Sequence, residues 1–384
     1  MNDDITVAPD FDATLFEQAE GPLVSLYLPV DDRAAARIRL KELLQEVNDK
    51  LEQEFAHREH TGVDARLDQV IERFDELAEG AAGSIAVLVG NDRTLVYQLG
   101  YAVGPLAVVD DSFYVKPLLK NFAFGSHYVL LGLSADRFAL IEGDFGSLRR
   151  WKFPEGLSDE FSELFPMVYD GLEGALDYES LENHMPPYHG YKSRNDVKKE
   201  EAEKFFRYVD KVVTERLLKD VDLPVILVSL PEHQAAFRRV STLPHLLDEG
   251  IEKDVGGIGE PELLAEARVV IERAREAHAR ELLQLFGDAE AHGGASADPA
   301  DIGLALVERK VRALFVAEDV YLPGGFNEET GAVVLFEQEP HERFQGPELA
   351  DQFARAALAQ DAEVLELPAE QMPNGASIAA LYRY

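Results

Sequence analysis

Apolar and polar positions alternate along the chain in two periods, one typical of strands and one of helices. Largely apolar runs at 23–28, 85–89 and 128–133 predict buried strands, and each is followed by turn-forming residues. The run 85–89 is expected to form a hairpin with 95–99 across Gly90-Asn91-Asp92. Two early segments have helical spacing instead. Their predicted apolar faces are Ile38, Leu40, Leu43, Leu44, Val47 and Leu51 for the first helix, and Leu67, Val70, Ile71, Phe74 and Leu77 for the second.

The rest of the chain continues the mixture of strands and helices. Its middle part is expected to hold strands at 128–133, 137–142 and 223–230, and helices at 196–219, 232–239 and 244–249. Its last part is expected to hold helices at 261–286, 299–309 and 347–359, strands at 313–317, 363–367 and 378–384, a loop at 287–298 and a Gly-rich excursion at 323–325. Strands that alternate with helices predict an α/β (α+β) fold class.

The length of the chain predicts more than one domain. With 384 residues it exceeds what one ordinary hydrophobic core holds. The predicted elements fall into three blocks, which we expect to be domains at 1–118, 119–258 and 259–384.

Composition excludes several kinds of protein. The chain has no cysteine, which rules out disulfides and cysteine-ligated zinc. It has no run of 18 apolar residues, so we expect no membrane partner, and the acidic start Met1-Asn2-Asp3-Asp4 lacks the pattern of a signal peptide. We therefore expect a cytoplasmic protein.

The charge is strongly negative, at -35, from 72 acidic and 37 basic residues. A surface this acidic is typical of proteins that work in high salt, although an acidic protein of ordinary salt conditions has the same composition. Broad non-specific binding to nucleic acid needs a positive surface. We therefore expect no DNA partner, and any RNA contact to be local.

Familiar catalytic and cofactor motifs are absent, and we predict no cofactor and no metal. Gly256-Gly257-Ile258-Gly259 does not have the spacing of a dinucleotide-binding loop and is interpreted as a linker. His57 and His60 are expected on one face of a helix, but without a third ligand they are interpreted as an exposed pair.

One segment, residues 191–219, departs from the acidity of the chain. It holds nine basic and six acidic residues, a local balance of 9 − 6 = +3. The basic residues are Lys192, Arg194, Lys198, Lys199, Lys204, Arg207, Lys211, Arg216 and Lys219. Either the segment contacts phosphates, or it is a solvated helix face with pairs such as Glu200 with Lys204.

Several segments resemble the three-domain class-1 peptide-chain release factors and Pelota, in the same order. Leu23 to Pro29 is similar to the first strand of that family, and Asp111 to Leu118 resembles the segment that leads into its middle domain. The most specific likeness is Val311 to Asp319, which follows a long helix, a Gly-Gly loop and a short helix. The resemblance implies a divergent bacterial member of this superfamily, with a ribonuclease-H-like middle domain and a C-terminal domain like the kink-turn-binding ribosomal proteins.

The residues that give release factors their chemistry are missing. The loop that corresponds to their Gly-Gly-Gln tripeptide is Tyr188 to Arg194, and it contains no Gly-Gly-Gln. The Gly-Gly pairs at 256–257, 293–294 and 324–325 are not followed by Gln either. The stop-codon-reading motif Asn-Ile-Lys-Ser is absent, and Val47-Asn48-Asp49-Lys50 is a poor substitute.

The resemblance implies a ribosome-associated translation factor, in rescue or hibernation, that is not a stop-codon-dependent peptidyl-tRNA hydrolase. Its expected partners are the ribosome, rRNA or tRNA, and a translational GTPase. The expected RNA contacts are His189, Lys192, Arg194, Lys198, Lys199, Lys204, Arg207 and Lys211. Two alternatives stay open. One is a hydrolase that uses the loop His184–Arg194, with His189, Tyr191 and Arg194 as acid–base candidates. The other is an acidic adaptor that binds a basic protein.

Overall fold

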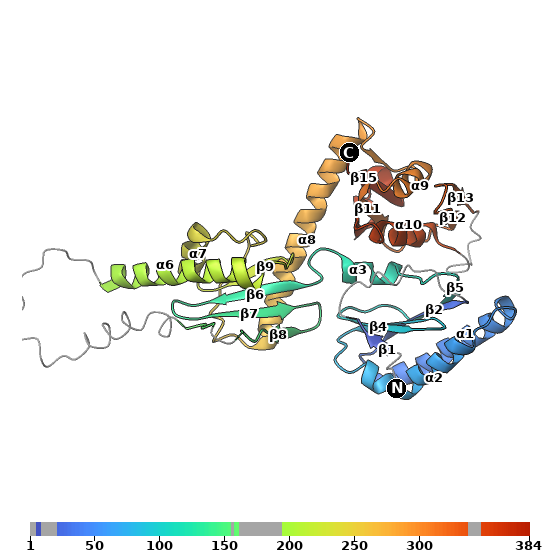
Figure 1. Ribbon diagram of the computed structural model, residues 1–384, viewed down its shortest axis with the longest axis horizontal. Helices are drawn as coiled ribbons and strands as arrows, with labels where there is room; N and C mark the ends of the chain where they lie inside the picture. Colours follow the sequence, from blue (N-terminus) through green and yellow to red (C-terminus); the bar gives the residue numbers. More distant parts are fainter. Residues whose placement is uncertain (1–4, 9–20, 155–156, 161–193, 337–346) are drawn as a thin grey trace, which may run out of the picture. The chain divides into compact units, whose positions relative to one another are not determined.

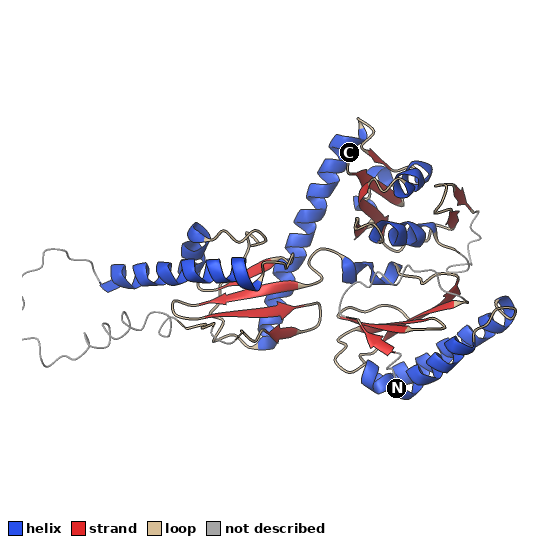
Figure 2. Cartoon of the chain, in the orientation of Figure 1, coloured by secondary structure: helices blue, strands red, loops and turns tan. Residues whose placement is uncertain are grey.

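The computed structural model describes residues 5–8, 21–154, 157–160, 194–336 and 347–384, with the side chains of helix α6 described from residue 201 on. Contacts divide the chain into two compact units. Unit 1 comprises residues 1–126 and 275–384, and unit 2 comprises residues 127–274. Figure 1 shows the elements along the chain, and Figure 2 shows separate sheets that are each accompanied by helices.

The N-terminal part of unit 1 is a sheet covered by two helices on one face. Its strands, in the order β1-β4-β3-β2-β5, are β1 (Ile5–Val7), β4 (Thr94–Leu99), β3 (Ser84–Val89), β2 (Leu23–Pro29) and β5 (Leu106–Asp110). The predicted hairpin of β3 and β4 is present. Helices α1 (Arg33–Glu54) and α2 (Thr61–Leu77) run beside this sheet (Figure 1). Their apolar side chains share one core cluster with those of the sheet. Asp32 caps α1, because its carboxylate accepts hydrogen bonds from the N–H groups of Ala34 and Ala35.

Two details of these helices differ from the prediction. Ile38 and Ile71, expected on the buried faces, are 64% and 41% exposed because they lie at the margin of the stripe that faces the sheet. His57 and His60 lie in the turn between α1 and α2, not on a helix. Their expected exposure holds for His57, whereas His60 is partly covered and its Nδ1 lies 2.9 Å from Asp64 Oδ2.

The C-terminal part of unit 1 contains a second sheet between helices. Its strands, in the order β10-β15-β11-β14, are β10 (Ala295–Ser296), β15 (Ile378–Tyr382), β11 (Val311–Ala317) and β14 (Glu363–Leu367). Helices α9 (Pro299–Val307) and α10 (Leu349–Leu358) cover one face. The second half of α8 (Glu260–Glu290) covers the other. A separate two-stranded ribbon pairs β12 (Gly324–Phe326) with β13 (Val333–Leu335).

Unit 2 is built on a four-stranded sheet in the order β8-β7-β6-β9. The strands are β8 (Leu148–Arg150), β7 (Phe138–Gly143), β6 (Tyr128–Leu133) and β9 (Val225–Val228). Helices α6 (Arg194–Val212) and α7 (Pro231–Val240) pack on one face, and the first half of α8 packs on the other (Figure 1). The sheet is therefore buried on both faces, which accounts for the continuous apolar runs of β6 and β9.

Three further predictions need correction or refinement. No helix forms at 244–249. The segment pairs with the edge strand β9 instead: the N–H of Val225 donates to the carbonyl of His245, and the N–H of Leu247 donates to the carbonyl of Val225, each at 2.8 Å. Helix α8 continues to Glu290, so the first residues of the expected loop 287–298 are helical. The Gly-rich excursion at 323–325 includes strand β12, whose Gly324 lies so close to the backbone of Val334 that a Cβ would sit 2.8 Å from its carbonyl oxygen.

The predicted mixed α/β class and its arrangement in separate sheets are confirmed. Each of the three predicted blocks contains one of the larger sheets. The domain limits at 118/119 and 258/259 stay a prediction. The Gly256–Gly259 segment forms a turn directly before α8, where the N–H of Gly257 donates to the carbonyl of Asp254 at 3.1 Å.

Candidate functional site: the basic face of helix α6

Helix α6 is held on unit 2 by one strongly apolar face. Phe205, Phe206 and Val209 are completely buried against the sheet and α7. The ring of Phe206 meets Phe237 of α7 edge-on, with centroids 6.1 Å apart. These contacts fix the rotation of the helix about its axis, and so decide which residues face solvent.

The opposite face carries a stripe of cations, which we call the α6 stripe: Lys204, Arg207 and Lys211. All three are exposed. At 3.6 residues per turn their side chains leave the helix within about 60° of one another, and their Cα atoms span about 10 Å along the axis. The positions thus form one row rather than a scatter around the helix.

The charges of the stripe are only partly neutralised. Arg207 lies 3.8 Å from Glu203, which is itself 3.4 Å from Arg239 of α7. Lys204 and Lys211 make no ion pair within the described part of the chain. Among the described residues nothing neutralises these two lysines, and exposed ammonium groups bind phosphate as point charges.

A buried carboxylate ties α6 to the loop after α7. Asp210 is 6% exposed, and its Oδ1 accepts hydrogen bonds from Ser241 Oγ at 2.9 Å and from the N–H of Thr242 at 2.8 Å. Its Oδ2 accepts a third from Thr242 Oγ1 at 2.8 Å. Because Asp210 is the neighbour of Lys211 in sequence, these hydrogen bonds fix the position of the helix at the end of the α6 stripe.

The helix ends in a wider turn. Residues Val213–Leu217 form a π-helical turn, in which the N–H of Leu218 donates to the carbonyl of Val213 at 2.8 Å. Such turns interrupt the regular ladder and are often found near functional sites. Arg216 and Lys219, two further cations of the predicted basic segment, are exposed at this end.

The structure brings together only part of the predicted site. Lys204, Arg207 and Lys211 share the α6 stripe, whereas Arg194, Lys198 and Lys199 lie in the part of α6 whose side chains are not described. His184, His189, Tyr191 and Lys192 lie outside the described residues. The proposed roles of all these residues in RNA binding or catalysis stay predictions.

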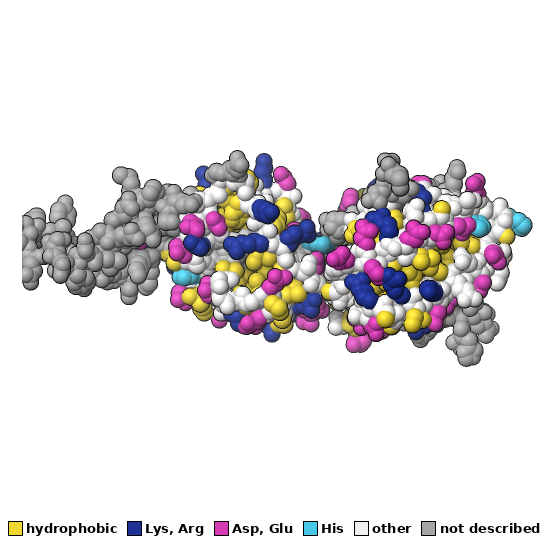
Figure 3. All heavy atoms as spheres, turned by 90° about the horizontal axis from the view of Figure 1, so that it is seen from below, with side chains coloured by type: hydrophobic (Ala, Val, Ile, Leu, Met, Phe, Trp, Pro, Cys, Tyr) yellow, Lys and Arg dark blue, Asp and Glu magenta, His cyan; other side chains and the backbone are white. Residues whose placement is uncertain are grey.

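On the face of the molecule that Figure 3 draws, charges of both signs are mixed. Figure 3 shows Lys and Arg side chains interspersed with Asp and Glu on the face that it draws. In the described part of the chain, no group of three His, Asp or Glu side chains is placed to hold a metal ion. None of its helices is long and apolar enough to cross a membrane.

A second polar cluster was not predicted from the sequence. Lys116 is almost fully buried, and its Nζ lies 2.7 Å from Oε1 of Glu348, whose other oxygen accepts from the Tyr114 hydroxyl at 2.6 Å. The backbone N–H groups of Val115 and Lys116 donate to Asp351 Oδ1 at 2.6 and 2.8 Å. A lysine inside the apolar run Phe113 to Leu119 was the available signal, but its acidic partners lie more than 200 residues away in sequence.

Comparisons with known proteins bear on the identity of the chain. No curated protein matches it. Among solved structures, the archaeal translation termination factor aRF1 is similar, at 14% identity and a TM-score of 0.25, over 95% of this chain and 94% of that one. The ribosome-bound archaeal Pelota in a model with ABCE1 is similar at 12% identity and a TM-score of 0.39, over 78% and 77%. Dom34 of S. cerevisiae is similar at 12% identity and a TM-score of 0.33, over 78% and 79%.

The family comparison is specific to one part of the chain. Residues 125–279 match the family model described as bacterial archaeo-eukaryotic release factor family 8. This range encloses all of unit 2 and therefore the whole of α6. The resemblance stated from the sequence is confirmed for this part of the chain: residues 125–279 carry the pattern of bacterial archaeo-eukaryotic release factor family 8.

Proposed function

We propose that this protein is a non-catalytic ribosome-associated factor that binds in the ribosomal A site during rescue or hibernation. The observation that carries the proposal is the family match over residues 125–279, the part of the chain that presents the α6 stripe. In this proposal the stripe contacts phosphates of rRNA or tRNA.

The charge of the chain supports a local contact. A protein of net charge -35 is repelled by RNA at long range, so binding has to come from a small region where cations are concentrated. Lys204 and Lys211, which make no ion pair in the described part of the chain, meet this requirement. A backbone contact of this kind positions a protein without reading sequence.

The missing motifs support a role without peptide release. Residues Tyr188 to Arg194 contain no Gly-Gly-Gln, and the chain contains no Asn-Ile-Lys-Ser. The proposed factor therefore neither reads a stop codon nor positions water at the peptidyl ester. A translational GTPase that delivers it to the ribosome is part of the proposal.

Co-sedimentation with ribosomes at the salt concentration of the native cell tests the proposal. We expect the full chain to pellet with 70S particles or a subunit in at least one growth phase. Absence from every ribosomal fraction in all growth phases would overturn the proposal.

The α6 stripe is tested with a triple variant and a charge-matched control. Lys204→Glu, Arg207→Glu and Lys211→Glu together should abolish pelleting, because they replace three phosphate contacts with repulsion. The control changes three exposed cations of unit 1 in the same way, Lys41→Glu, Arg280→Glu and Arg312→Glu. Both variants change the net charge equally, so an equal effect of the two would show that total charge, not the stripe, governs binding.

A further inference from the structure

A cavity of about 420 Å³ lies within unit 1, far in sequence from α6. It is bordered by the loop Tyr101–Leu106, by the segment from Tyr114 to Lys120, and by Asp319, Val320, Tyr321 and Glu366. This volume falls in the range of small-molecule sites, which are mostly apolar with a few polar groups. Neither the family match nor the proposed function involves these residues.

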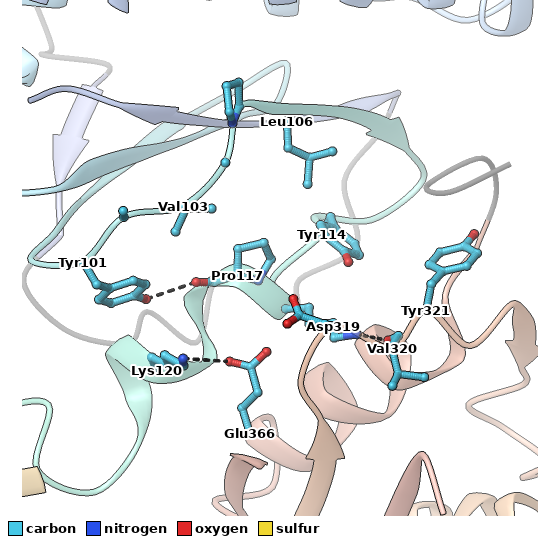
Figure 4. A pocket seen from close by; sticks show the side chains of 14 residues that line it. Tyr101, Val103, Leu106, Tyr114, Pro117, Lys120, Asp319, Val320, Tyr321 and Glu366 are labelled. Carbon is cyan, nitrogen blue, oxygen red and sulfur yellow. Dashed lines mark hydrogen bonds and ion pairs between the residues drawn. The ribbon is translucent and has the colours of Figure 1, made fainter. Parts of the chain in front are cut away.

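One wall of the cavity is apolar and aromatic. Figure 4 shows Val103 and Leu106 on one side, with the rings of Tyr101, Tyr114 and Tyr321 around the space. The hydroxyl of Tyr101 donates to the carbonyl of Pro117 at 3.0 Å, and that of Tyr114 donates to Glu348 at 2.6 Å. Because these two hydroxyls are engaged, the two tyrosines offer mainly their rings to a ligand.

The opposite wall is acidic. In Figure 4, Asp319 and Glu366 lie on the side away from Val103 and Leu106. Lys116 is neutralised by Glu348, at 2.7 Å. Lys120 lies 3.1 Å from Glu318 and 4.0 Å from Glu366. Because Lys116 and Lys120 each pair with a glutamate that does not line the cavity, Asp319 and Glu366 leave this wall negative, which disfavours a phosphate or carboxylate ligand.

Glu366 is only weakly paired. Its side chain is 16% exposed, and its contact with Lys120, at 4.0 Å, is too long for a hydrogen bond. Burial raises the pKa of its carboxyl group. A cation closer than Lys120 would stabilise the charged form of this buried carboxylate. The stabilisation is greater when the apolar stem of the cation also covers the aromatic wall.

We propose that this cavity binds an ammonium or guanidinium group on an apolar stem. The cationic head lies between Glu366 and Asp319, and the stem packs against Tyr101, Val103 and Leu106. Two kinds of molecule carry such a cationic group on an apolar stem: a free polyamine, and a peptide with a Lys or Arg side chain.

Calorimetric titration of the full chain in about 0.3 M KCl, which screens exposed charges to a few ångströms, tests the proposal. The probes are spermidine and Nα-acetyl-lysine methylamide, with Nα,Nε-diacetyl-lysine methylamide as the uncharged control. We expect saturable binding of a charged probe with one site per chain, and none of the diacetyl compound. Tighter binding of spermidine identifies the polyamine source, and tighter binding of the lysine derivative identifies a peptide side chain.

Two variants and one control assign the binding to the cavity. Glu366→Gln keeps the shape but removes the charge, and should weaken binding about ten-fold. Glu370→Gln removes one exposed charge nearby in sequence and should leave binding unchanged. Val103→Trp keeps every charge, fills the cavity, and should also weaken binding.

No saturable binding, or equal binding by the Glu366→Gln and Glu370→Gln variants, would overturn the proposal. The result is separate from the proposed ribosomal role, because Glu366→Gln leaves the α6 stripe intact and is expected to pellet with ribosomes like the unaltered chain.

Discussion

Asp210 is the residue through which the fold of unit 2 holds the α6 stripe in place. It is buried, and it accepts three hydrogen bonds from Ser241 and Thr242. Nothing in the sequence distinguishes Asp210 from the other acidic residues of the basic segment, because its partners come from a loop about thirty residues later. Lys204 and Lys211, by contrast, follow from helical spacing once Phe205 and Val209 are assigned to the core.

Replacing Asp210 should destabilise unit 2 markedly. Asp210→Ala leaves the N–H of Thr242 and two hydroxyls without their acceptor, which we expect to lower the free energy of unfolding by about 3 kcal/mol. Urea unfolding monitored by circular dichroism measures this loss. Asp220→Ala removes an exposed carboxylate just beyond the helix and should cost less than about 0.5 kcal/mol. Equal effects of the two changes would contradict the anchoring role.

At the scale of elements, the long buried strands were predictable from the sequence and the shortest edge strands were not. Continuous apolar runs identified β2, β3, β6 and β11, because burial on both faces of a sheet leaves few polar positions. The short strands β1, β8 and β10 gave no such signal. The expected helix at 244–249 failed because residues 245–247 pair with Val225 at the edge of the sheet instead of forming helical hydrogen bonds.

The buried cluster at the start of α10 was beyond sequence reasoning, since it joins positions far apart in the chain. Asp351 Oδ1 accepts hydrogen bonds from the N–H groups of Val115 and Lys116, and Arg355 Nε lies 3.3 Å from Asp351 Oδ2. Burial raises the pKa of Asp351 to about 6, although the positive charge of Arg355 lowers it. The contact between α10 and the Val115–Lys116 segment should therefore depend on pH.

The sign of this dependence follows from the pKa. An unfolded aspartate has a pKa of about 3.9, so between pH 4 and pH 6 the folded chain binds more protons at Asp351 than the unfolded chain. The contribution of Asp351 to the free energy of unfolding is therefore fully present below about pH 4. It falls by about 2–3 kcal/mol as the pH rises through 6.

Asp351→Asn removes this titration and serves as the reference. We expect the stability of the unaltered chain, relative to the variant, to decrease from pH 4 to pH 7, as measured by urea unfolding at each pH. A difference that stays constant or grows with pH would contradict the assignment.

At the scale of the whole molecule, the dominant property is the excess of negative charge. The net charge of -35 is spread over a surface on which both signs occur (Figure 3). Self-repulsion of such a surface opposes folding, and salt screens it. Adaptation to high salt was predicted from this composition and stays a prediction.

Salt should accordingly stabilise the protein. We expect the Tm to rise by about 5 °C or more between 0.1 M and 2 M KCl, because screening weakens the repulsion among the 72 acidic residues. Scanning calorimetry measures the change, and sucrose serves as an uncharged control. A Tm that is unchanged or lower in KCl would contradict salt adaptation.

The central proposal is that the chain binds the ribosomal A site through the α6 stripe. Its most direct test is competition on purified 70S ribosomes, whose A site is either vacant or filled with deacylated tRNA, with the bound protein measured by pelleting. The account predicts strong binding to vacant ribosomes and a progressive loss as the A site fills. Binding that is independent of A-site occupancy would contradict it.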